Sequence, residues 1–192
     1  MIAGLVLAGG AAVRMGGGDK PLLAVGAAPI LARILATLRP QVGPLALSAN
    51  GDPARFAEFG LPVLTDGPFA GAGPLAGVLA GLDWAEAQGA TALLSVPGDT
   101  PFIPADLAAR LGEAPACAES AGVRHHLVAL WPVAARAALR AWLGRPGSRS
   151  VRRFAETIGM RGVAFPAAEP DPFMNVNTPD DLARARRIAA LR

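Results

Sequence analysis

The stretch that decides the fold is Ile2-Ala-Gly-Leu-Val-Leu7 followed by Ala8-Gly-Gly10, an uncharged apolar run that ends in glycines. A short apolar run closed by turn residues is typical of a strand buried on both faces. Three similar runs follow at Leu45–Ala49, Pro62–Leu64 and Ala92–Val96. The first half of the chain therefore predicts four buried strands.

Segments with helical spacing separate these strands. Pro29–Arg39 repeats apolar residues at intervals of three and four, and Pro74–Ala87 has the length of a second long helix. Asp52–Pro53 provides the N-cap and first residue of a short helix that ends at Phe59. The alternation of strands and helices predicts an α/β fold whose parallel sheet is covered on both faces.

The second half mixes strands and helices less regularly. Thr178 and Pro179 have the types expected at the N-cap and first position of a C-terminal helix. No linker, repeat or low-complexity run divides the chain, so a single domain over residues 1–192 is expected. The other predicted elements are strands at His126–Trp131 and Val163–Phe165 and helices at Val133–Leu143 and Val151–Glu156.

Composition narrows the class of protein. The 192 residues are 52% hydrophobic and 17% charged, which excludes a disordered chain. The single cysteine, Cys117, excludes an internal disulfide and a cysteine-based zinc site, and it fits a reducing cytoplasm. The N-terminus lacks a basic signal-peptide region, and the longest other uncharged stretch, residues 67–82, is too short and too broken by glycine to span a bilayer. We expect a cytoplasmic protein without a membrane partner.

Charge is divided unevenly along the chain. Residues 1–100 carry a net charge of −2, and residues 101–192 carry +5. A nucleic-acid partner is not expected, because the cluster Arg149, Arg152 and Arg153 has no interleaved aromatic residues and the chain has no Tyr. The basic half can instead face an anionic small molecule or only solvent.

Lysine is nearly absent from the sequence. Of the 18 basic residues, 17 are arginines and one is Lys20. Where arginine serves as the general cation, a lone lysine indicates a position that needs a compact ammonium group. The alternative is a surface lysine with no particular role.

The unusual polar residues follow the four predicted strands. In open α/β sheets, ligands bind outside the carboxyl ends of the strands. The residues at those ends are the glycines of 9–18 with Arg14 and Lys20 after the first strand, Ser48 and Asn50 after the second, Asp66 after the third, and Asp99 after the fourth.

The glycine-rich loop at residues 9–18 is a candidate phosphate cradle. Glycines let backbone N–H groups approach an anion, and Arg14 and Lys20 add positive charge. The loop matches neither a Walker motif nor G-x-G-x-x-G. A simple turn is the alternative. Gly71–Gly77 is a weak dinucleotide-binding variant, whose alternative is a loop before a helix packed closely on the sheet.

Two carboxylates have two interpretations each. Asp99 can bind Mg²⁺, which takes one or two carboxylates together with substrate phosphates, or it can cap the segment Pro101–Leu111. Asp66 can accept hydrogen bonds from a base or sugar, or it can belong to an ordinary Asp-Gly-Pro turn.

The motifs together resemble the molybdenum cofactor guanylyltransferases, in order from residue 5 to about residue 187. They are Leu-x-Gly-Gly (7–10), Arg-Met-Gly-Gly-x-Asp-Lys-x-Leu-Leu (14–23), Gly-Pro-Leu-Ala-Gly (73–77), Asp-Thr-Pro-x-Ile-Pro (99–104) and Asn-Val-Asn-Thr-Pro-Asp-Asp-Leu (175–182). The resemblance implies a Rossmann-like, three-layer α/β/α fold of the nucleotide-diphospho-sugar transferase type with a mostly parallel sheet.

The resemblance also implies an activity. It is transfer of GMP from GTP to molybdenum-bound molybdopterin, with release of pyrophosphate and a requirement for Mg²⁺. Residues 1–100 would bind the nucleotide and residues 101–192 the acceptor, and molybdoenzymes or cofactor-assembly proteins are further candidate partners. By position, the residues implied are Lys20, Arg14 and Asp99 in catalysis, Asp99 as the metal ligand, and Leu7, Ala8, Gly9, Gly10, Lys20, Ser48, Asn50, Asp66 and Asp99 in nucleotide binding.

Two positions depart from the family pattern. Ser48 replaces the first Asn of an Asn-x-Asn pattern, and His125-His126-Leu127 replaces His-Pro-Thr. A structural role is expected for both histidines, whereas Asn177 is either a metal or acceptor contact or a turn residue. Transfer of CMP, transfer to a sugar phosphate, and a non-catalytic GTP-binding adaptor are the alternative functions.

Overall fold

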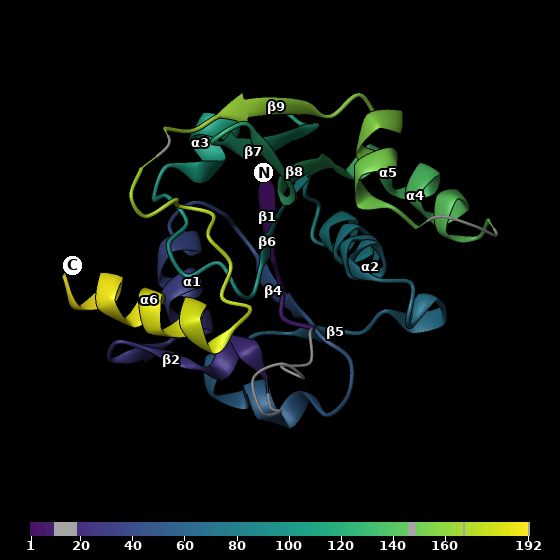
Figure 1. The fold of residues 1–192 in the computed structure, drawn as a ribbon. Helices are drawn as coiled ribbons and strands as arrows, with labels where there is room; N and C mark the ends of the chain where they lie inside the picture. The colour runs from purple at the N-terminus through teal and green to yellow at the C-terminus, as the bar shows by residue number, and fades with distance from the viewer. Residues whose placement is uncertain (10–18, 146–148, 167, 192) are drawn as a thin grey trace.

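The computed structural model describes residues 1–9, 19–145, 149–166 and 168–191. Within them, a seven-stranded sheet has the order β5-β4-β1-β6-β8-β7-β9, and β2 and β3 form a separate hairpin (Figure 1). The strands are β1 Ile2–Leu7, β2 Ala24–Val25, β3 Ala28–Pro29, β4 Leu45–Ser48, β5 Val63–Leu64, β6 Ala92–Pro97, β7 Ala116–Ser120, β8 Val123–Pro132 and β9 Arg161–Ala164.

Helices cover both faces of the sheet, which gives the expected three layers. Apolar residues of α1, α3 and α6 pack on one face, and those of α2, α4 and α5 pack on the other. The helices are α1 Ile30–Leu38, α2 Pro74–Ala87, α3 Leu107–Leu111, α4 Arg136–Leu143, α5 Val151–Thr157 and α6 Pro179–Ala190, with 3-10 helices at Lys20–Leu22, Pro53–Phe59, Gly67–Phe69 and Val133–Ala135.

The sheet is mostly parallel, as predicted. β5, β4, β1 and β6 are parallel neighbours, and β7 is parallel to β9. β8 runs antiparallel to both β6 and β7, so its first residues lie at the edge where the parallel strands end. The four strands predicted in the first half are all present.

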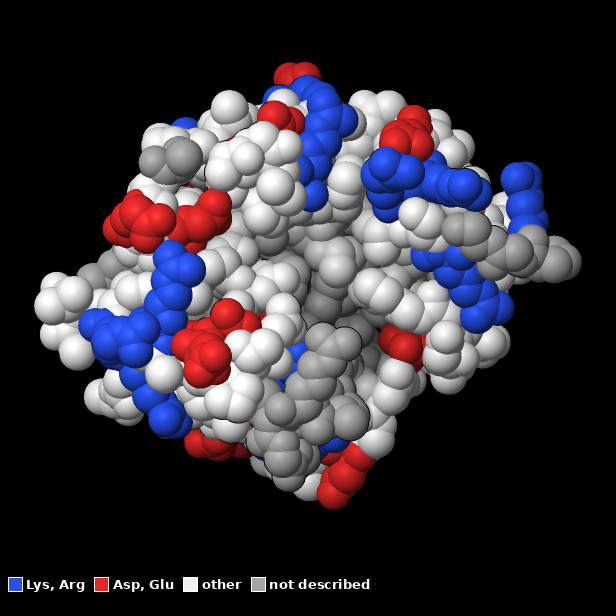
Figure 2. Space-filling model, viewed as in Figure 1, with Lys and Arg blue, Asp and Glu red and all other residues white. Residues whose placement is uncertain are grey.

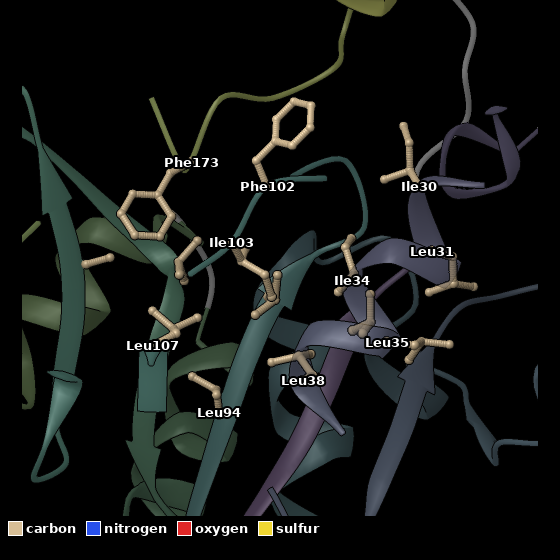
Figure 3. Packing of buried hydrophobic residues seen from close by; sticks show 14 of the residues in the cluster. Ile30, Leu31, Ile34, Leu35, Leu38, Leu94, Phe102, Ile103, Leu107 and Phe173 are labelled. Atoms are coloured by element: carbon tan, nitrogen blue, oxygen red, sulfur yellow. The ribbon is translucent and has the colours of Figure 1, made fainter. Parts of the chain in front are cut away.

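Two apolar clusters hold the layers together. On one face, Ile34 and Leu38 of α1 point toward Leu94 of β6, and Ile103 fills the space beside them (Figure 3). On the other face, α2 packs over β1 and β6, and Trp131 is fully buried. Strands that are apolar throughout fit this arrangement, because both of their faces are covered.

The helix starts follow the predicted capping chemistry. The Asp52 side chain accepts a hydrogen bond from the Ala54 N–H at 2.9 Å, although the helix that follows is a 3-10 helix. Thr178 and Asp181 form a reciprocal capping box at the start of α6. Both helix starts could be predicted from the sequence because each cap depends only on residues within one helical turn.

The structure departs from the prediction in three places, two of them in the second half of the chain and one in the first. β7 was not predicted, because Ala116–Ser120 has small residues and no β-branched or aromatic side chain. β8 begins at Val123 rather than His126, and His125 pairs with Ala118 of β7, whereas the pairing of β8 with β6 covers only Ala129–Pro132. The hairpin of β2 and β3 was also missed.

None of the described helices is long and apolar enough to cross a membrane.

A buried polar pair joins β6 to β8 in the centre of the sheet. The Ser95 hydroxyl donates to the Leu127 carbonyl at 2.7 Å and accepts from the Trp131 indole N–H at 2.8 Å. Both side chains are fully buried. Loss of the hydroxyl therefore leaves an indole N–H with no partner in an apolar environment.

Replacing Ser95 with Ala is expected to lower the free energy of unfolding by about 1–3 kcal/mol, the usual cost of an unsatisfied buried donor. Urea denaturation followed by circular dichroism measures it. Thr157→Ala, an exposed position at the end of α5, is the control and should change stability by no more than about 0.5 kcal/mol. Equal stabilities for the two variants would contradict the assignment.

Candidate active site

The ends of three parallel strands lie level with one another. Leu7 of β1 pairs with Ser48 of β4 and with Pro97 of β6. Just beyond, the N–H groups of Ala8 and Gly9 both donate to the Ser48 carbonyl, at 2.8 and 3.0 Å. The segments that leave the three strands are therefore brought together at one edge of the sheet.

The larger of two adjoining cavities opens at this edge. Its volume is about 710 Å³. The face drawn in Figure 2 is hollowed near its middle, and basic side chains gather over α4 and α5 beside the hollow. The lining residues are Leu7, Gly9, Asp19, Ser48, Ala49, Asn50, Arg55, Asp66, Gly71, Gly73, Pro74 and Gly77.

Asn50 and Asp66 hold each other by two hydrogen bonds. The Asn50 amide donates to Asp66 Oδ2 at 2.6 Å, and the Asp66 backbone N–H donates to Asn50 Oδ1 at 3.0 Å. The Asp66 backbone also begins the Gly67–Phe69 turn, so the turn is present, but the carboxylate makes no capping bond to it. The side chain is thus fixed at the cavity wall, with Oδ1 free of any hydrogen bond from Asn50.

Arg55 and Asp19 form a second network that sequence reasoning missed. The Arg55 guanidinium pairs with the Asp19 carboxylate at 3.2 Å and donates to the Asn50 carbonyl at 2.5 Å. It also lies over the Phe56 ring, 4.9 Å from the centroid. A cation in the short helix after the second strand was the available signal, but nothing local showed that it reaches residue 19.

The smaller cavity, about 170 Å³, lies beside the first and contains the lone lysine. The two cavities share Leu7, Gly9 and Pro74. Lys20 Nζ donates to Asn177 Oδ1 at 2.6 Å across 157 residues of sequence. The lining is Leu7, Ala8, Gly9, Lys20, Pro21, Pro74, Pro97, Gly98, Asp99 and Leu127.

Asp99 is a half-buried residue whose carboxylate lines this smaller cavity. Burial raises its pKa above the ordinary value, and the nearby Lys20 charge partly opposes the rise. Asp99 Oδ1 is buried and accepts no hydrogen bond from the described residues. The capping interpretation is wrong, since α3 begins only at Leu107, with Asp106 at its N-cap.

These features fit a Mg²⁺ ligand. A carboxylate oxygen that accepts no hydrogen bond is the type of ligand that Mg²⁺ prefers, and the Lys20 cation lies nearby. Among the described residues, no group of three or more His, Cys, Asp or Glu side chains is arranged to hold a metal. An ion on Asp99 would therefore need further oxygens from bound phosphates and water.

The N-terminus of α2 borders both cavities. Gly73 precedes it with a φ of +81°, which favours glycine, and Pro74 is its first residue. Along the helix, a Cβ on Gly77 would overlap the Ser48 hydroxyl. The expected close packing of this helix on the sheet is present, and its free N–H groups give the cavity edge a partial positive charge.

Not all of the predicted residues are found at the cavities in the part of the chain that the structure describes. Gly10 and Arg14 lie outside the described residues. The side chains of Arg149, Arg152 and Arg153 are exposed, and Arg152 lies 3.7 Å from Glu156 one turn along α5. The structure favours a solvated face for these arginines.

The chain was compared with known families and structures. A family model described as the MobA-like NTP transferase domain matches residues 4–159. The chain belongs to the MobA-like NTP transferase family. Two relatives, from Acidiphilium cryptum and Mesorhizobium japonicum, are named molybdenum cofactor guanylyltransferase. The first is 60% identical over 94% of this chain and 92% of its own, and the second is 51% identical over 97% and 95%.

Solved structures confirm the nucleotidyltransferase fold. Molybdopterin-guanine dinucleotide biosynthesis protein A from Archaeoglobus fulgidus has a TM-score of 0.76 at 20% identity, with both chains fully covered. The 4-diphosphocytidyl-2C-methyl-D-erythritol synthase from Anaerococcus prevotii has a TM-score of 0.74 at 12% identity, covering 100% of this chain and 96% of its own. At these identities the likeness concerns the fold of this MobA-like transferase and not its substrates.

Asp99→Asn is expected to raise the melting temperature of the ligand-free protein at pH 7. The pKa of Asp99 is higher in the folded than in the unfolded state, so ionisation of this carboxyl weakens the fold as the pH rises through the folded-state value. The advantage of the variant should therefore vanish below about pH 4, where both states are protonated. Thermal denaturation in chelator from pH 3.5 to 8 measures it, and a less stable variant at pH 7 would contradict the burial argument.

Proposed function

We propose that this chain transfers GMP from GTP to molybdenum-bound molybdopterin and releases pyrophosphate. The observation that carries the proposal is the convergence of Lys20 and Asp99 in a small cavity that adjoins a larger one, where Asn50 fixes Asp66. The names of relatives that are 47–60% identical support the choice of nucleotide and acceptor.

The two cavities suggest how a nucleotide would lie. A base that is hydrogen-bonded to Asp66 would place the nucleoside in the larger cavity. Leu7, Gly9 and Pro74 line both cavities and so connect this position with Lys20. The phosphates would then pass the backbone of Gly9 and the N-terminus of α2, both of which favour an anion. Arg14 stays a predicted phosphate contact.

The reaction requires no nucleophile from the protein. An oxygen of the acceptor's terminal phosphate forms a bond to the α-phosphorus of GTP, and the bond from that phosphorus to the bridging oxygen of the β-phosphate breaks. Pyrophosphate leaves with that bonding electron pair. Such transfers depend on alignment and on neutralising the charge of the phosphate oxygens.

Lys20 and Asp99 have different roles in aligning the phosphates and neutralising their charge. Lys20 offers a compact, three-donor charge to the phosphates, and Asn177 holds its ammonium group in place. Asp99 would hold Mg²⁺, which when bound supplies positive charge to the phosphates and orients them. The pair lies close enough for the Lys20 charge to lower the pKa of Asp99 against the effect of burial.

Asp66 gives a physical basis for choosing guanine. Guanine presents two adjacent N–H donors, N1 and N2, to a carboxylate, whereas the corresponding edge of cytosine offers one amine beside an acceptor nitrogen. Asn50 keeps the Asp66 carboxylate oriented at the cavity wall. A carboxylate held in this way is complementary to guanine and places an acceptor against the acceptor of cytosine.

The acceptor is proposed to approach from the half formed by residues 101–192, which carries the excess positive charge. A cytoplasmic location is proposed with the function. The product would serve molybdoenzymes or the proteins that assemble them.

The defining experiment measures pyrophosphate release with Mg²⁺, molybdenum-loaded molybdopterin and GTP, with CTP and UTP in parallel. Release with GTP alone among the three supports the proposal. Preference for CTP identifies a cytidylyltransferase, and release only with a sugar phosphate as acceptor changes the substrate class. GTP binding without release under any condition identifies a non-catalytic module and overturns the proposal.

Lys20→Ala is expected to lower turnover about 100- to 1000-fold, because one well-placed charge on the phosphates contributes about 2.7–4 kcal/mol to transition-state stabilisation. Steady-state pyrophosphate release measures it, and circular dichroism checks that the fold survives. The control is Arg33→Ala, which removes a cation of α1 that donates to the Val25 carbonyl and lines neither cavity, and which should retain turnover. Near-normal guanylylation by Lys20→Ala would remove Lys20 from the mechanism.

Asn50→Ala is expected to reduce discrimination between GTP and CTP by about tenfold, since one lost hydrogen bond to a charged group contributes about 1.5 kcal/mol. The ratio of kcat/KM for the two nucleotides is the measurement. Asp52→Ala, which removes a nearby cap without facing Asp66, is the matched control. An unchanged ratio in Asn50→Ala would show that Asp66 does not need this clamp.

A further inference from the structure

A polar cluster in the second half of the chain has no role in the mechanism described so far. It joins Ser120 at the end of β7, His125 on β8 and Asp171 in the segment before α6. The Ser120 hydroxyl donates to Asp171 Oδ2 at 2.7 Å and lies 2.8 Å from His125 Nε2. A hydroxyl has one proton, which here goes to the carboxylate, so His125 Nε2 must be the donor to Ser120.

This cluster does not have the arrangement of a hydrolase. In a catalytic triad the histidine lies between the serine and the acid, and the serine faces the substrate. Here Ser120 lies between the other two, and it is 2% exposed. Burial also lowers the pKa of His125, which keeps the ring neutral near pH 7. The cluster therefore anchors a segment and does not attack a substrate.

The anchored segment is residues 171–177. The other carboxylate oxygen of Asp171 accepts the Phe173 N–H at 2.7 Å, and its carbonyl accepts the Met174 N–H at 3.1 Å. The Phe173 ring is buried, with its centroid 5.0 Å from those of both His125 and Phe165. Figure 3 shows Phe173 entering the same apolar cluster as Ile103 and Leu107. The start of the segment is therefore fixed by polar and apolar contacts together.

The end of the same segment reaches the candidate active site. The Val176 N–H donates to the Asp99 carbonyl at 2.8 Å, and Asn177 Oδ1 accepts the bond from Lys20 at 2.6 Å. Asp181 of α6 then accepts the Asn177 N–H at 3.0 Å. Between its anchor and α6, this short segment touches both residues that carry the proposed chemistry.

We propose that His125, Ser120 and Asp171 are positioning residues for phosphate transfer. They hold residues 171–177 so that Asn177 orients the Lys20 ammonium group and Val176 fixes the backbone of Asp99. The inference rests on the proposed function, because it assigns Lys20 and Asp99 their roles. It also means that part of the nucleotide-phosphate site is built by the half of the chain expected to bind the acceptor.

The test removes the central hydroxyl with Ser120→Ala. We expect kcat to fall about ten- to a hundredfold, the usual effect of a small misplacement of reacting groups, while KM for GTP changes less than about twofold because Asp66 and Asn50 are untouched. Amide hydrogen exchange should become faster in residues 171–178 and stay unchanged in β1 and β4. A general loss of stability would instead raise exchange throughout.

Two further variants separate positioning from destabilisation. Leu139→Val shortens a fully buried side chain of α4 on the opposite face of the sheet and should lower the melting temperature while retaining kcat. Asn177→Ala removes the hydrogen bond that this segment provides to Lys20 Nζ. If the cluster acts through Asn177, Ser120→Ala combined with Asn177→Ala should lose no more than about twofold in kcat relative to Asn177→Ala alone.

The outcomes for the two proposals are distinguishable. If the wild-type chain releases no pyrophosphate, the proposed function fails, and the exchange of residues 171–178 still decides the positioning. Unchanged exchange in Ser120→Ala overturns the positioning role, and fully multiplicative losses of kcat in the double variant overturn its action through Asn177. Should Ser120→Ala fail to fold, Asp171→Asn at a half-exposed site replaces it, with the same expected results.

Discussion

The level alignment of β1 with β4 and β6 is the constraint on which the remaining structure depends. Leu7 is paired on both sides, so the glycine-rich loop, the Asn50 turn and Asp99 leave the sheet at the same height. The space between them is tight: a Cβ on Gly98 would lie 2.9 Å from Pro21 Cγ and 3.0 Å from the Leu7 carbonyl. A slip of one residue in either pairing would separate the charges of the site, because successive side chains of a strand point to opposite faces.

Features that depend only on residues close together in the chain could be predicted from the sequence. β1, the caps at Asp52 and Thr178, and the polar residues after each strand are local patterns, and the parallel order of the first half follows from their alternation. The partners within the site were not predictable in this way. Asn177 reaches Lys20 only because α6 begins beside the hairpin, and Arg55 reaches Asp19 only because the helix after β4 turns back. Such contacts are set by the packing of whole elements.

The candidate site is also where local rules are broken. A carboxylate with a buried, unpartnered oxygen at Asp99 and a half-buried guanidinium at Arg55 both weaken a ligand-free fold. Elsewhere, the fully buried Ser95 and Trp131 satisfy each other, whereas the Trp142 indole N–H of α4 is buried without a hydrogen-bond partner among the described residues. Two of the three such atoms in the described residues, Asp99 Oδ1 and Arg55 Nε, thus lie near the strand ends, where the proposed charged ligand would bind.

The bond between Lys20 and Asn177 has a practical consequence. Lys20 is the one lysine of the sequence, so apart from the N-terminal amine its Nζ is the only primary amine of the chain. The reactivity of this amine toward acylating reagents depends on whether its N–H groups are hydrogen-bonded to Asn177 and to a bound ligand. A single labelling reaction, read as one mass increment on one peptide, would thus report whether a ligand occupies the proposed phosphate site, without any engineered probe.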